Sequence, residues 1–318
     1  MANSFPNRVY GCAIVKAINS NYNADFSHQP RTLPDGTAYA TDKAFKYLVR
    51  NFWTRMYPEE KVLYFKRFNQ NMNPFTLDEA YSNMFGKANP EAGKGDVLKN
   101  LLSSLDVKLF GATFANKGNK KENIPSVSIS IHGPLQIGHG VNRYPESLIY
   151  PEQIMSPFRD DKEGKGEADA STLGTQYKLA EGHYVHHFSL NPSNLDAHLK
   201  RLGEATEGIT PEDVEKLKQA MCSGATYFDS SAKAGIDNEL LLWVQLKPEA
   251  KVVLPTFTQL IKVERRNPQE KTVIDLSDLT ALLASPRYEG TIEKIELYYD
   301  QPLTEVKGAP ESAEIFAL

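Results

Sequence analysis

Apolar and polar positions divide the chain into short blocks whose spacing predicts strands and helices in alternation. Residues 8–18 (RVYGCAIVKAI) are rich in β-branched and aromatic side chains, which predicts a buried strand. In residues 125–137, Val127, Ile129 and Ile131 alternate with hydroxyl side chains, so this strand should have one apolar and one polar face. Further strands are predicted at 104–114, 183–190, 239–246 and 291–299, and helices near 57–69, 76–85, 193–202, 211–222 and 276–284.

The stretch from residue 19 to residue 50 joins a polar loop to a basic helix. Asparagines, prolines and the Asp35-Gly36 pair exclude regular structure from its first half. Thr41 is suited to cap a helix, and that helix would carry one stripe of polar side chains at i, i+3, i+4 and i+7: Lys43, Lys46, Tyr47 and Arg50. Side-chain amides, the free N–H groups of a helix N-terminus and cations are the groups that bind the negative charges of a polyanion. An ordinary surface loop before an amphipathic helix explains the pattern equally well.

Two stretches interrupt the main series of elements. Residues 52–95 are aromatic, amide-rich and broken by prolines, which indicates an inserted subdomain. Residues 138–181 are too long for a structureless connection, which indicates a second insertion. The last 18 residues are expected to form a loose tail. Outside these two insertions, the order of the predicted strands and helices indicates an α+β, ferredoxin-like β-α-β-β-α-β core. The sheet of such a core has one face covered by helices and one open face.

Composition narrows the class of protein. With 318 residues, 41% of them hydrophobic, the chain can bury a sizeable core. It has neither a long apolar run nor a secretory signal, and its two cysteines lack metal-type spacing, so a cytoplasmic location without membrane contact is expected. The net charge is −4, but residues 1–121 hold 17 Lys/Arg against 10 Asp/Glu and residues 122–318 hold 19 against 30. These balances of +7 and −11 fit one polyanion-binding face, or copies that stack head to tail.

Motifs for catalysis, a cofactor or a metal are weak. His183 and His187 would lie about 13 Å apart on a strand, too far to share an ion. A loop at 86–96 lacks the spacing and the hydroxyl residue of a phosphate-binding loop. Asp25 is a loop carboxylate without an evident structural role. We therefore expect no metal, no cofactor and no catalytic residues.

Four stretches, in order along the chain, resemble one known family. They are AINSNYNADFSHQPRTLPDGTAYATDKAFKYLVRNF (17–52), DVKLFGATF (106–114), ISIHGPLQIGHGVNRYPE (129–146) and LGTQYKLAEGHYVHHFSLNP (173–192). Together they resemble the Csh-type (Cas-seven) backbone subunit of type I-B CRISPR Cascade complexes, in the RAMP superfamily. The resemblance implies an RNA-recognition-motif palm (1–51, 96–137 and 182–318), a helical finger (52–95) and a β-hairpin thumb (138–181).

The resemblance also implies a function. Several copies of such a subunit form a head-to-tail helical filament along the guide RNA (crRNA), beside other Cascade subunits. They hold its backbone without reading its sequence and present it for pairing with a target DNA strand in antiviral defence. The implied RNA contacts fall on the loop, the helix stripe, the sheet and the thumb: Asn19, Asn21, Asn23, Arg31, Lys43, Lys46, Arg50, His132, Gln136, Arg143, Thr172, Gln176, Tyr177 and Lys178. A thumb also needs an apolar wedge, for which the candidates are Ile149, Met155 and Phe158.

Two other functions remain open. A RAMP-type endoribonuclease would process precursor RNA through His28 or His132, or cut target RNA through Asp25. Composition alone also allows a small-molecule α+β enzyme, which would carry no RNA through purification.

Overall fold

The computed structural model describes residues 4–86, 93–116, 126–144, 146–155, 173–203, 206–264 and 270–318, without the side chains of Met155 and Leu173. The strands in these residues are β1 (Val9–Ser20), β2 (Tyr39–Ala40), β3 (Gly111–Asn116), β4 (Val127–His132), β5 (Leu135–Asn142), β6 (Ile149–Met155), β7 (Leu173–Leu190), β8 (Ile236–Leu246), β9 (Lys262–Glu264), β10 (Thr272–Asp275), β11 (Ile292–Tyr299), β12 (Thr304–Lys307) and β13 (Ala313–Ala317). The helices are α1 (Asp42–Met56), α2 (Leu77–Phe85), α3 (Lys94–Leu102), α4 (Leu105–Phe110), α5 (Asp196–Leu202), α6 (Pro211–Ser223) and α7 (Ser277–Leu283), with short 3₁₀ turns at Pro192–Leu195, Thr258–Leu260 and Pro286–Tyr288.

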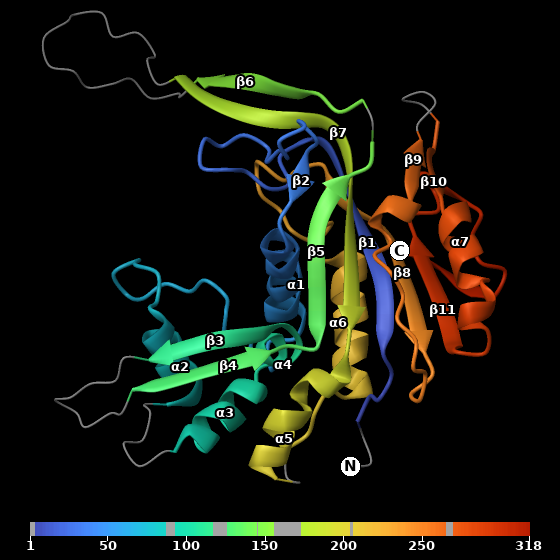
Figure 1. The fold of residues 1–318 in the computed structure, drawn as a ribbon. Helices are drawn as coiled ribbons and strands as arrows, with labels where there is room; N and C mark the ends of the chain where they lie inside the picture. Colours follow the sequence, from blue (N-terminus) through green and yellow to red (C-terminus); the bar gives the residue numbers. More distant parts are fainter. Residues whose placement is uncertain are drawn as a thin grey trace, which may run out of the picture.

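A large sheet with β1 near its centre organises the chain (Figure 1). Its strand order is β13-β11-β8-β1-β7-β5-β2, with β6 paired to β7 outside this path. The four strands β8, β1, β7 and β5 pair antiparallel in that order. Together with α1 and α6 they occur along the chain in the order β1-α1-β5-β7-α6-β8, with β2, α2 to α4, β3, β4 and β6 between them.

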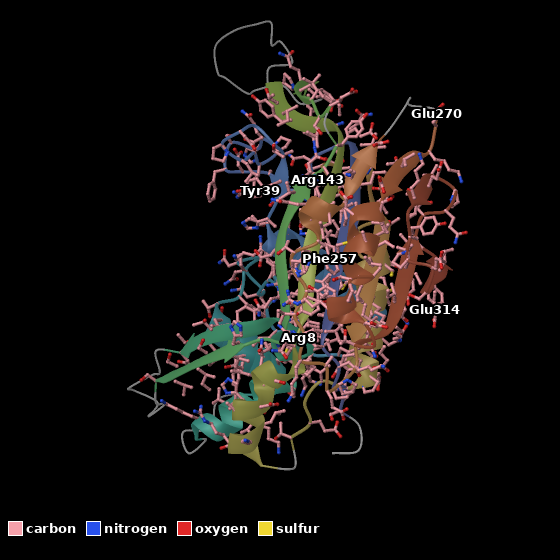
Figure 2. All side chains as sticks on the ribbon, turned by 45° about the vertical axis from the view of Figure 1, so that its right-hand side comes forward. Arg8, Tyr39, Arg143, Phe257, Glu270 and Glu314 are labelled. Carbon is pink, nitrogen blue, oxygen red and sulfur yellow. The ribbon has the colours of Figure 1, made fainter. Side chains whose placement is uncertain are left out.

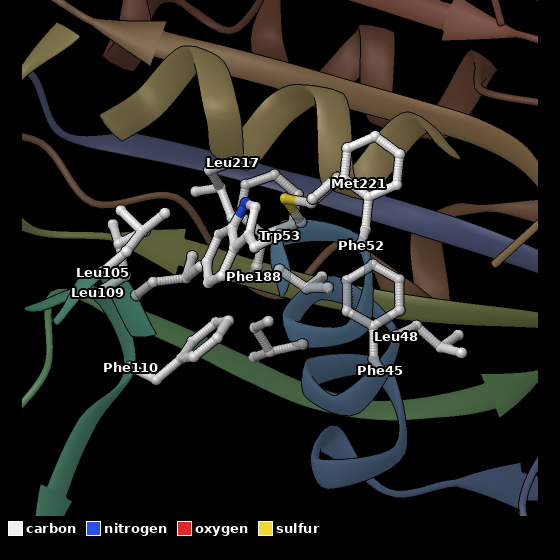
Figure 3. Close-up of a cluster of buried hydrophobic side chains, with 14 of the residues drawn as sticks. Phe45, Leu48, Phe52, Trp53, Leu105, Leu109, Phe110, Phe188, Leu217 and Met221 are labelled. Atoms are coloured by element: carbon white, nitrogen blue, oxygen red, sulfur yellow. The ribbon is translucent and has the colours of Figure 1, made fainter. Parts of the chain in front are cut away.

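The helices α1 and α6 pack on one face of this sheet (Figures 1 and 3). Thr41 caps α1 as predicted, because its hydroxyl accepts the N–H of Ala44. Trp53, fully buried in α1, stacks on Phe110 of α4 with ring centroids 5.6 Å apart and donates its indole N–H to the carbonyl of Lys216 in α6. These contacts hold α1 rigidly between the sheet, α4 and α6.

The opposite face of the sheet is also covered, so the predicted open face is wrong in this region. The covering layer is a three-stranded sheet, β12-β10-β9, together with α7 and Thr258–Leu260. Phe257 is fully buried there, and its N–H is donated to Nδ1 of His187 on β7 (Figure 2). Tyr10, Cys12 and Ile14 of β1 point into this second core. The exposed margin of the sheet is β5, where Gln136, Gly138 and His139 face outward.

The C-terminal residues do not form the predicted loose tail. β12 pairs with β10, and β13 adds a parallel edge strand to β11 in the main sheet. The ring of Phe316 stacks on Tyr298 with centroids 4.7 Å apart. The helix predicted at 276–284 is present as α7 and ends before Pro286, as expected.

Residues 57–86, 93–116 and 126–132, which follow α1, form a lobe beside its lower part (Figure 1). Helix α2 is where the sequence predicted it, but no helix spans 57–69, and residues 105–110 are helical rather than extended. Strands β3 and β4 pair only with each other, outside the main sheet. Gly111 starts β3 with φ +72, and a Cβ there would lie 2.3 Å from the backbone N of Gly133, so the sharp turn out of α4 needs glycine.

An arm leaves the sheet at its upper end (Figure 1). It consists of β6 and the first half of β7, which pair antiparallel from Ile149↔Leu179 to Met155↔Leu173. The second half of β7 continues into the sheet beside β1 and β5, so one long strand joins arm and sheet. In the described residues no helix is long and apolar enough to cross a membrane.

Candidate nucleic-acid interface

Three features project to the same side of the main sheet in Figure 1. The arm lies at the top, the β3–β4 hairpin with α2 lies at the lower left, and the loop of residues 20–41 with α1 lies between them. Most of the predicted RNA-contact residues belong to these features. Their side chains nevertheless differ widely in exposure and in the hydrogen bonds and ion pairs that they make within the protein.

The basic stripe of α1 runs from the surface into the interior. Lys43 has an 87% exposed side chain, and its Nζ lies 3.9 Å from the carboxylate of Asp42. Lys46 is mostly buried, with Nζ 3.0 Å from Asp42 and 5.4 Å from the ring centroid of Phe110. Burial opposes the charge of Asp42, but the hydrogen bond and charge of Lys46 outweigh it and lower the pKa of Asp42. Lys43 is therefore the cation of this stripe best placed to neutralise a ligand.

Arg50, the last member of the stripe, makes a structural ion pair. Its Nε donates to Oδ2 of Asp106 at 2.9 Å, and the Asp106 side chain is fully buried. The same carboxylate accepts the N–H groups of Leu63 and Tyr64. The guanidinium also lies over the ring of Phe110, so Arg50 joins α1 to the lobe.

Asparagine side chains of the loop connect it by hydrogen bonds to the arm and to α1. Asn19 accepts a hydrogen bond from the hydroxyl of Tyr150 on the arm. Asn21 is buried, and its amide donates to the carbonyls of His28 and Tyr177. The Asn23 side-chain oxygen accepts both the N–H and the hydroxyl of Thr41 at the start of α1. The loop is thus fixed to both the arm and the helix.

Asp25 has the structural role that sequence reasoning did not find. Its Oδ1 accepts the N–H groups of Ser27 and Gln29 and the hydroxyl of Ser27, at 2.8 to 3.0 Å. The Ser27 hydroxyl is the main cause of a lowered pKa of Asp25, which stays charged as the anchor of a tight turn. Arg31 supports this turn by donating its Nε to the carbonyl of Ala24.

The arm presents its predicted contact residues on two different faces. Tyr177 shares one face with Pro151, whereas Gln176 and Lys178 lie on the other, because neighbouring residues of a strand alternate. Lys178 forms a 2.7 Å ion pair with Glu152, whose hydrogen bond raises the pKa of the lysine. Among the predicted wedge residues, Ile149 packs at the base of the arm against the core. Phe158, Thr172 and the Met155 side chain lie outside the described residues.

The remaining predicted contacts lie on or near the sheet. His132 is exposed on β4, in the separate hairpin, and so does not belong to the main sheet as the sequence suggested. Gln136 donates its amide to the carbonyl of Gly133, and Arg143 donates its Nε to the carbonyl of Ile261 near the start of β9. Figure 2 shows Arg143 close to the root of the arm and Tyr39 at the sheet edge. Tyr39 packs on the exposed His139, a pair that the sequence did not single out.

The three histidines of β7 point into the protein rather than to a shared ligand. His183 contacts Glu239 and Glu181, His186 contacts the hydroxyl of Tyr22, and His187 accepts the N–H of Phe257. Within the residues that the structure describes, no cluster of three His, Cys, Asp or Glu side chains is arranged to hold a metal.

Comparison with known proteins identifies the family. A sequence model described as "CRISPR-associated protein Cas7" matches residues 7–283, which include the loop, α1, the lobe and the arm. The chain belongs to the Cas7 family. Its Cas7 match ends before β11, so the C-terminal strands β11 to β13 lie beyond the part that the family model describes. No curated protein matches the chain.

The fold of this Cas7 protein also matches solved structures at low sequence identity. A chain titled "CRISPR RNA-guided surveillance complex, pre-nicking" is 12% identical, with a TM-score of 0.56 over 98% of this chain and 96% of that chain. A chain titled "CRISPR RNA-guided surveillance complex" is 13% identical, with a TM-score of 0.51 over 97% of this chain and 94% of that one. At these identities the matches establish a shared fold over nearly the whole chain.

Proposed function

We propose that this Cas7 protein is a non-catalytic subunit that binds the backbone of guide RNA in a type I-B Cascade complex in the cytoplasm. The observation that carries the proposal is the family match over residues 7–283, together with a fold similar to subunits of RNA-guided surveillance complexes. The type I-B assignment rests on the sequence stretches quoted above. Copies of the subunit would polymerise along the RNA and present it to a target DNA strand.

The parts of the fold take the roles expected of a hand. The antiparallel strands β8-β1-β7-β5 with α1 and α6 correspond to the ferredoxin-like, RNA-recognition palm. The lobe, which starts after α1 and extends beyond the finger predicted at 52–95 as far as residue 132, serves as the finger, and the arm of β6 and β7 serves as the thumb. Because the second face of the palm is covered by C-terminal elements, the RNA would lie on the side of α1 and the arm, and not on an open sheet as in many RNA-recognition modules.

Sequence-independent binding follows from the groups that this side exposes. Lys43 supplies an exposed cation at the start of α1, and the hydrogen-bonded loop holds its backbone and hydroxyl groups in fixed positions. Phosphate contacts of this kind fix the register of a strand without reading its bases. A guide held in this way is ordered before its target arrives, and base pairing then selects the sequence. The basic first third and acidic remainder of the chain favour head-to-tail contacts between copies.

Replacing Lys43 by alanine should weaken RNA binding by the same factor for unrelated sequences. We expect the slope of log affinity against log salt to fall by about 1, because one phosphate contact is lost. Filter binding of two unrelated RNAs at several salt concentrations measures this. Adding Lys46→Ala should lower the slope by about 1 more only if RNA displaces Lys46 from Asp42. Lys271→Ala, which removes an exposed lysine from the C-terminal part, is the matched control. A loss confined to one RNA sequence would contradict the proposal.

The endoribonuclease alternative makes a different prediction. We expect no cleavage when purified protein meets repeat RNA, or when the assembled complex meets RNA complementary to its guide. The three hydrogen bonds accepted by Asp25 favour a structural role for this carboxylate. Cleavage abolished by Asp25→Ala, His28→Ala or His132→Ala would overturn the non-catalytic assignment. Sequencing of the RNA that co-purifies with the protein should show spacers with repeat-derived ends.

A further inference from the structure

Two loops far apart in sequence are built on the same turn. In the first, the N–H of Asp25 is donated to the carbonyl of Gln29, and Oδ1 of Asp25 accepts the N–H groups of Ser27 and Gln29. The N–H of His28 is donated to the carbonyl of Asp25, and His28 has a left-handed φ of 65°. A β-bridge between Ala24 and Pro30 closes the turn.

The second loop repeats this scheme in the lobe. The N–H of Asn69 is donated to the carbonyl of Asn73, and Oδ1 of Asn69 accepts the N–H groups of Asn71 and Asn73. The N–H of Met72 is donated to the carbonyl of Asn69, and Met72 has a φ of 59°. A bridge between Phe68 and Pro74 closes it. Both turns hold a non-glycine residue in a left-handed conformation, which costs energy and tends to persist where function requires it.

Both turns display apolar side chains at the surface. Phe26, next to Asp25, is 100% exposed, and Met72 and Phe68 of the second turn are 75% and 48% exposed. In Figure 1 both loops project on the side of α1 that carries the arm and the hairpin. Because each turn is closed by internal hydrogen bonds, the backbone from which these side chains project is already ordered before a ligand binds.

The surroundings of these side chains are those of a nucleic-acid site. Residues 61–76 contain three Lys/Arg, four Asn/Gln and no Asp/Glu, although the whole chain carries a net charge of −4. The Nζ of Lys66 lies 4.9 Å from the ring centroid of Phe68. In the first turn, residues 24–30, the one acidic side chain is Asp25, which accepts hydrogen bonds from the turn itself, and Arg31 lies beside it. A protein groove would favour a continuous apolar patch, whereas isolated apolar tips among amides and cations suit bases on a phosphate backbone.

We infer that the two matched turns are stacking posts, each of which takes an unpaired base of a single nucleic-acid strand on Phe26 or on Phe68 with Met72. The inference rests on the proposed function and assigns it two contact points that lie outside the arm and the helix stripe. The shared chemistry is an unpaired base, which a guide RNA or a DNA strand can equally supply. Stacking on an aromatic ring accepts every base, so these contacts preserve sequence independence.

The test is equilibrium binding of the purified full chain to three probes: 30-nucleotide oligo(U) RNA, 30-nucleotide oligo(dT) DNA and a 30-base-pair RNA duplex. Phe26→Ala and Phe68→Ala should each weaken binding of a single strand by roughly tenfold, without a change in the salt slope. The duplex, whose bases are already stacked, should bind as before. Leu303→Ala, which removes an exposed leucine (56%) from the C-terminal part, should change nothing.

A tryptophan at the tip of the first turn gives a direct measurement. Trp53 and Trp243 are fully buried, so the fluorescence of Phe26→Trp protein responds to ligands chiefly through the new side chain. Quenching by oligo(U) supports a guide contact, and quenching by oligo(dT) alone supports a DNA-strand contact. If the wild type binds RNA while both alanine variants bind equally well, the stacking role is overturned. It is also overturned if Phe26→Ala disrupts only self-association. A wild type that binds neither strand would instead overturn the proposed function.

Discussion

Asp106→Ala should destabilise the protein by about 3–5 kcal/mol, because it leaves buried partners without a counterpart. The Asp106 carboxylate is fully buried and holds Arg50 of α1 through a 2.9 Å ion pair. It also accepts two backbone N–H groups, from Leu63 and Tyr64. Without it, the Arg50 guanidinium, which is largely shielded from water, has no counterion. Two backbone N–H groups of a segment without regular structure also lose their hydrogen-bond acceptor.

Urea denaturation followed by tryptophan fluorescence measures this loss, because Trp53 packs on Phe110 beside the ion pair. Asp278→Ala is the matched control, since it breaks a 2.8 Å ion pair with Lys262 in which both side chains are about half exposed. Exposed pairs contribute at most about 1 kcal/mol, so the control should remain near wild type. Equal losses in the two variants would show that the Asp106 site is not the anchor that its contacts indicate.

This site explains why the helix predicted at 57–69 is absent. The apolar residues there suit a helix, but the N–H groups of Leu63 and Tyr64 are donated to the carboxylate of Asp106, 42 to 43 residues away, and not to carbonyls one turn earlier. Local pattern cannot reveal such a partner. The same limit applies to β13, whose pairing with β11 depends on how the whole C-terminal part folds back.

The covered second face of the sheet did leave a signal in the sequence. Residues 9–17 of β1 are buried at every position, and the sequence shows there an almost continuous apolar run instead of an alternation. Strands buried on both faces have this pattern. The alternating strand β4, by contrast, was predicted correctly in its faces but lies in a separate hairpin, because alternation says nothing about the pairing partner.

The local structure of the candidate site was predictable, but the contacts of its side chains were not. A capped helix with cations after an asparagine-rich loop is local information, and Thr41 and α1 are confirmed. The partners that occupy Asn19 and Asn21 are residues of the arm, Tyr150 and Tyr177, more than 130 positions away. The exposure of Phe26 and Met72 likewise depends on the turns that hold them, which the apolar pattern of the sequence does not indicate.

Raising the pH above neutrality should destabilise the protein through His183. Burial alone would lower the pKa of this imidazole, but the carboxylates of Glu239 and Glu181 outweigh it and raise the pKa to about 9. A folded-state pKa above the unfolded value of about 6.5 means that the stabilisation is complete below pH 6.5. It is then lost progressively as the pH rises toward 9, by about 3 kcal/mol in total.

Urea midpoints measured from pH 6 to pH 9.5 test this expectation. In His183→Gln protein the alkaline loss should disappear, and stability at pH 7 should be lower because Glu239 remains buried beside Thr304 without a cation. His187→Gln is the matched control: burial lowers the pKa of His187 to about 4, so this histidine titrates only below neutrality and the alkaline loss should persist. Because His183 lies where β7 passes from the arm into the sheet, the same titration should loosen the root of the arm. If wild type and His183→Gln show the same loss above pH 7, the ion pair with Glu239 is not what stabilises this junction.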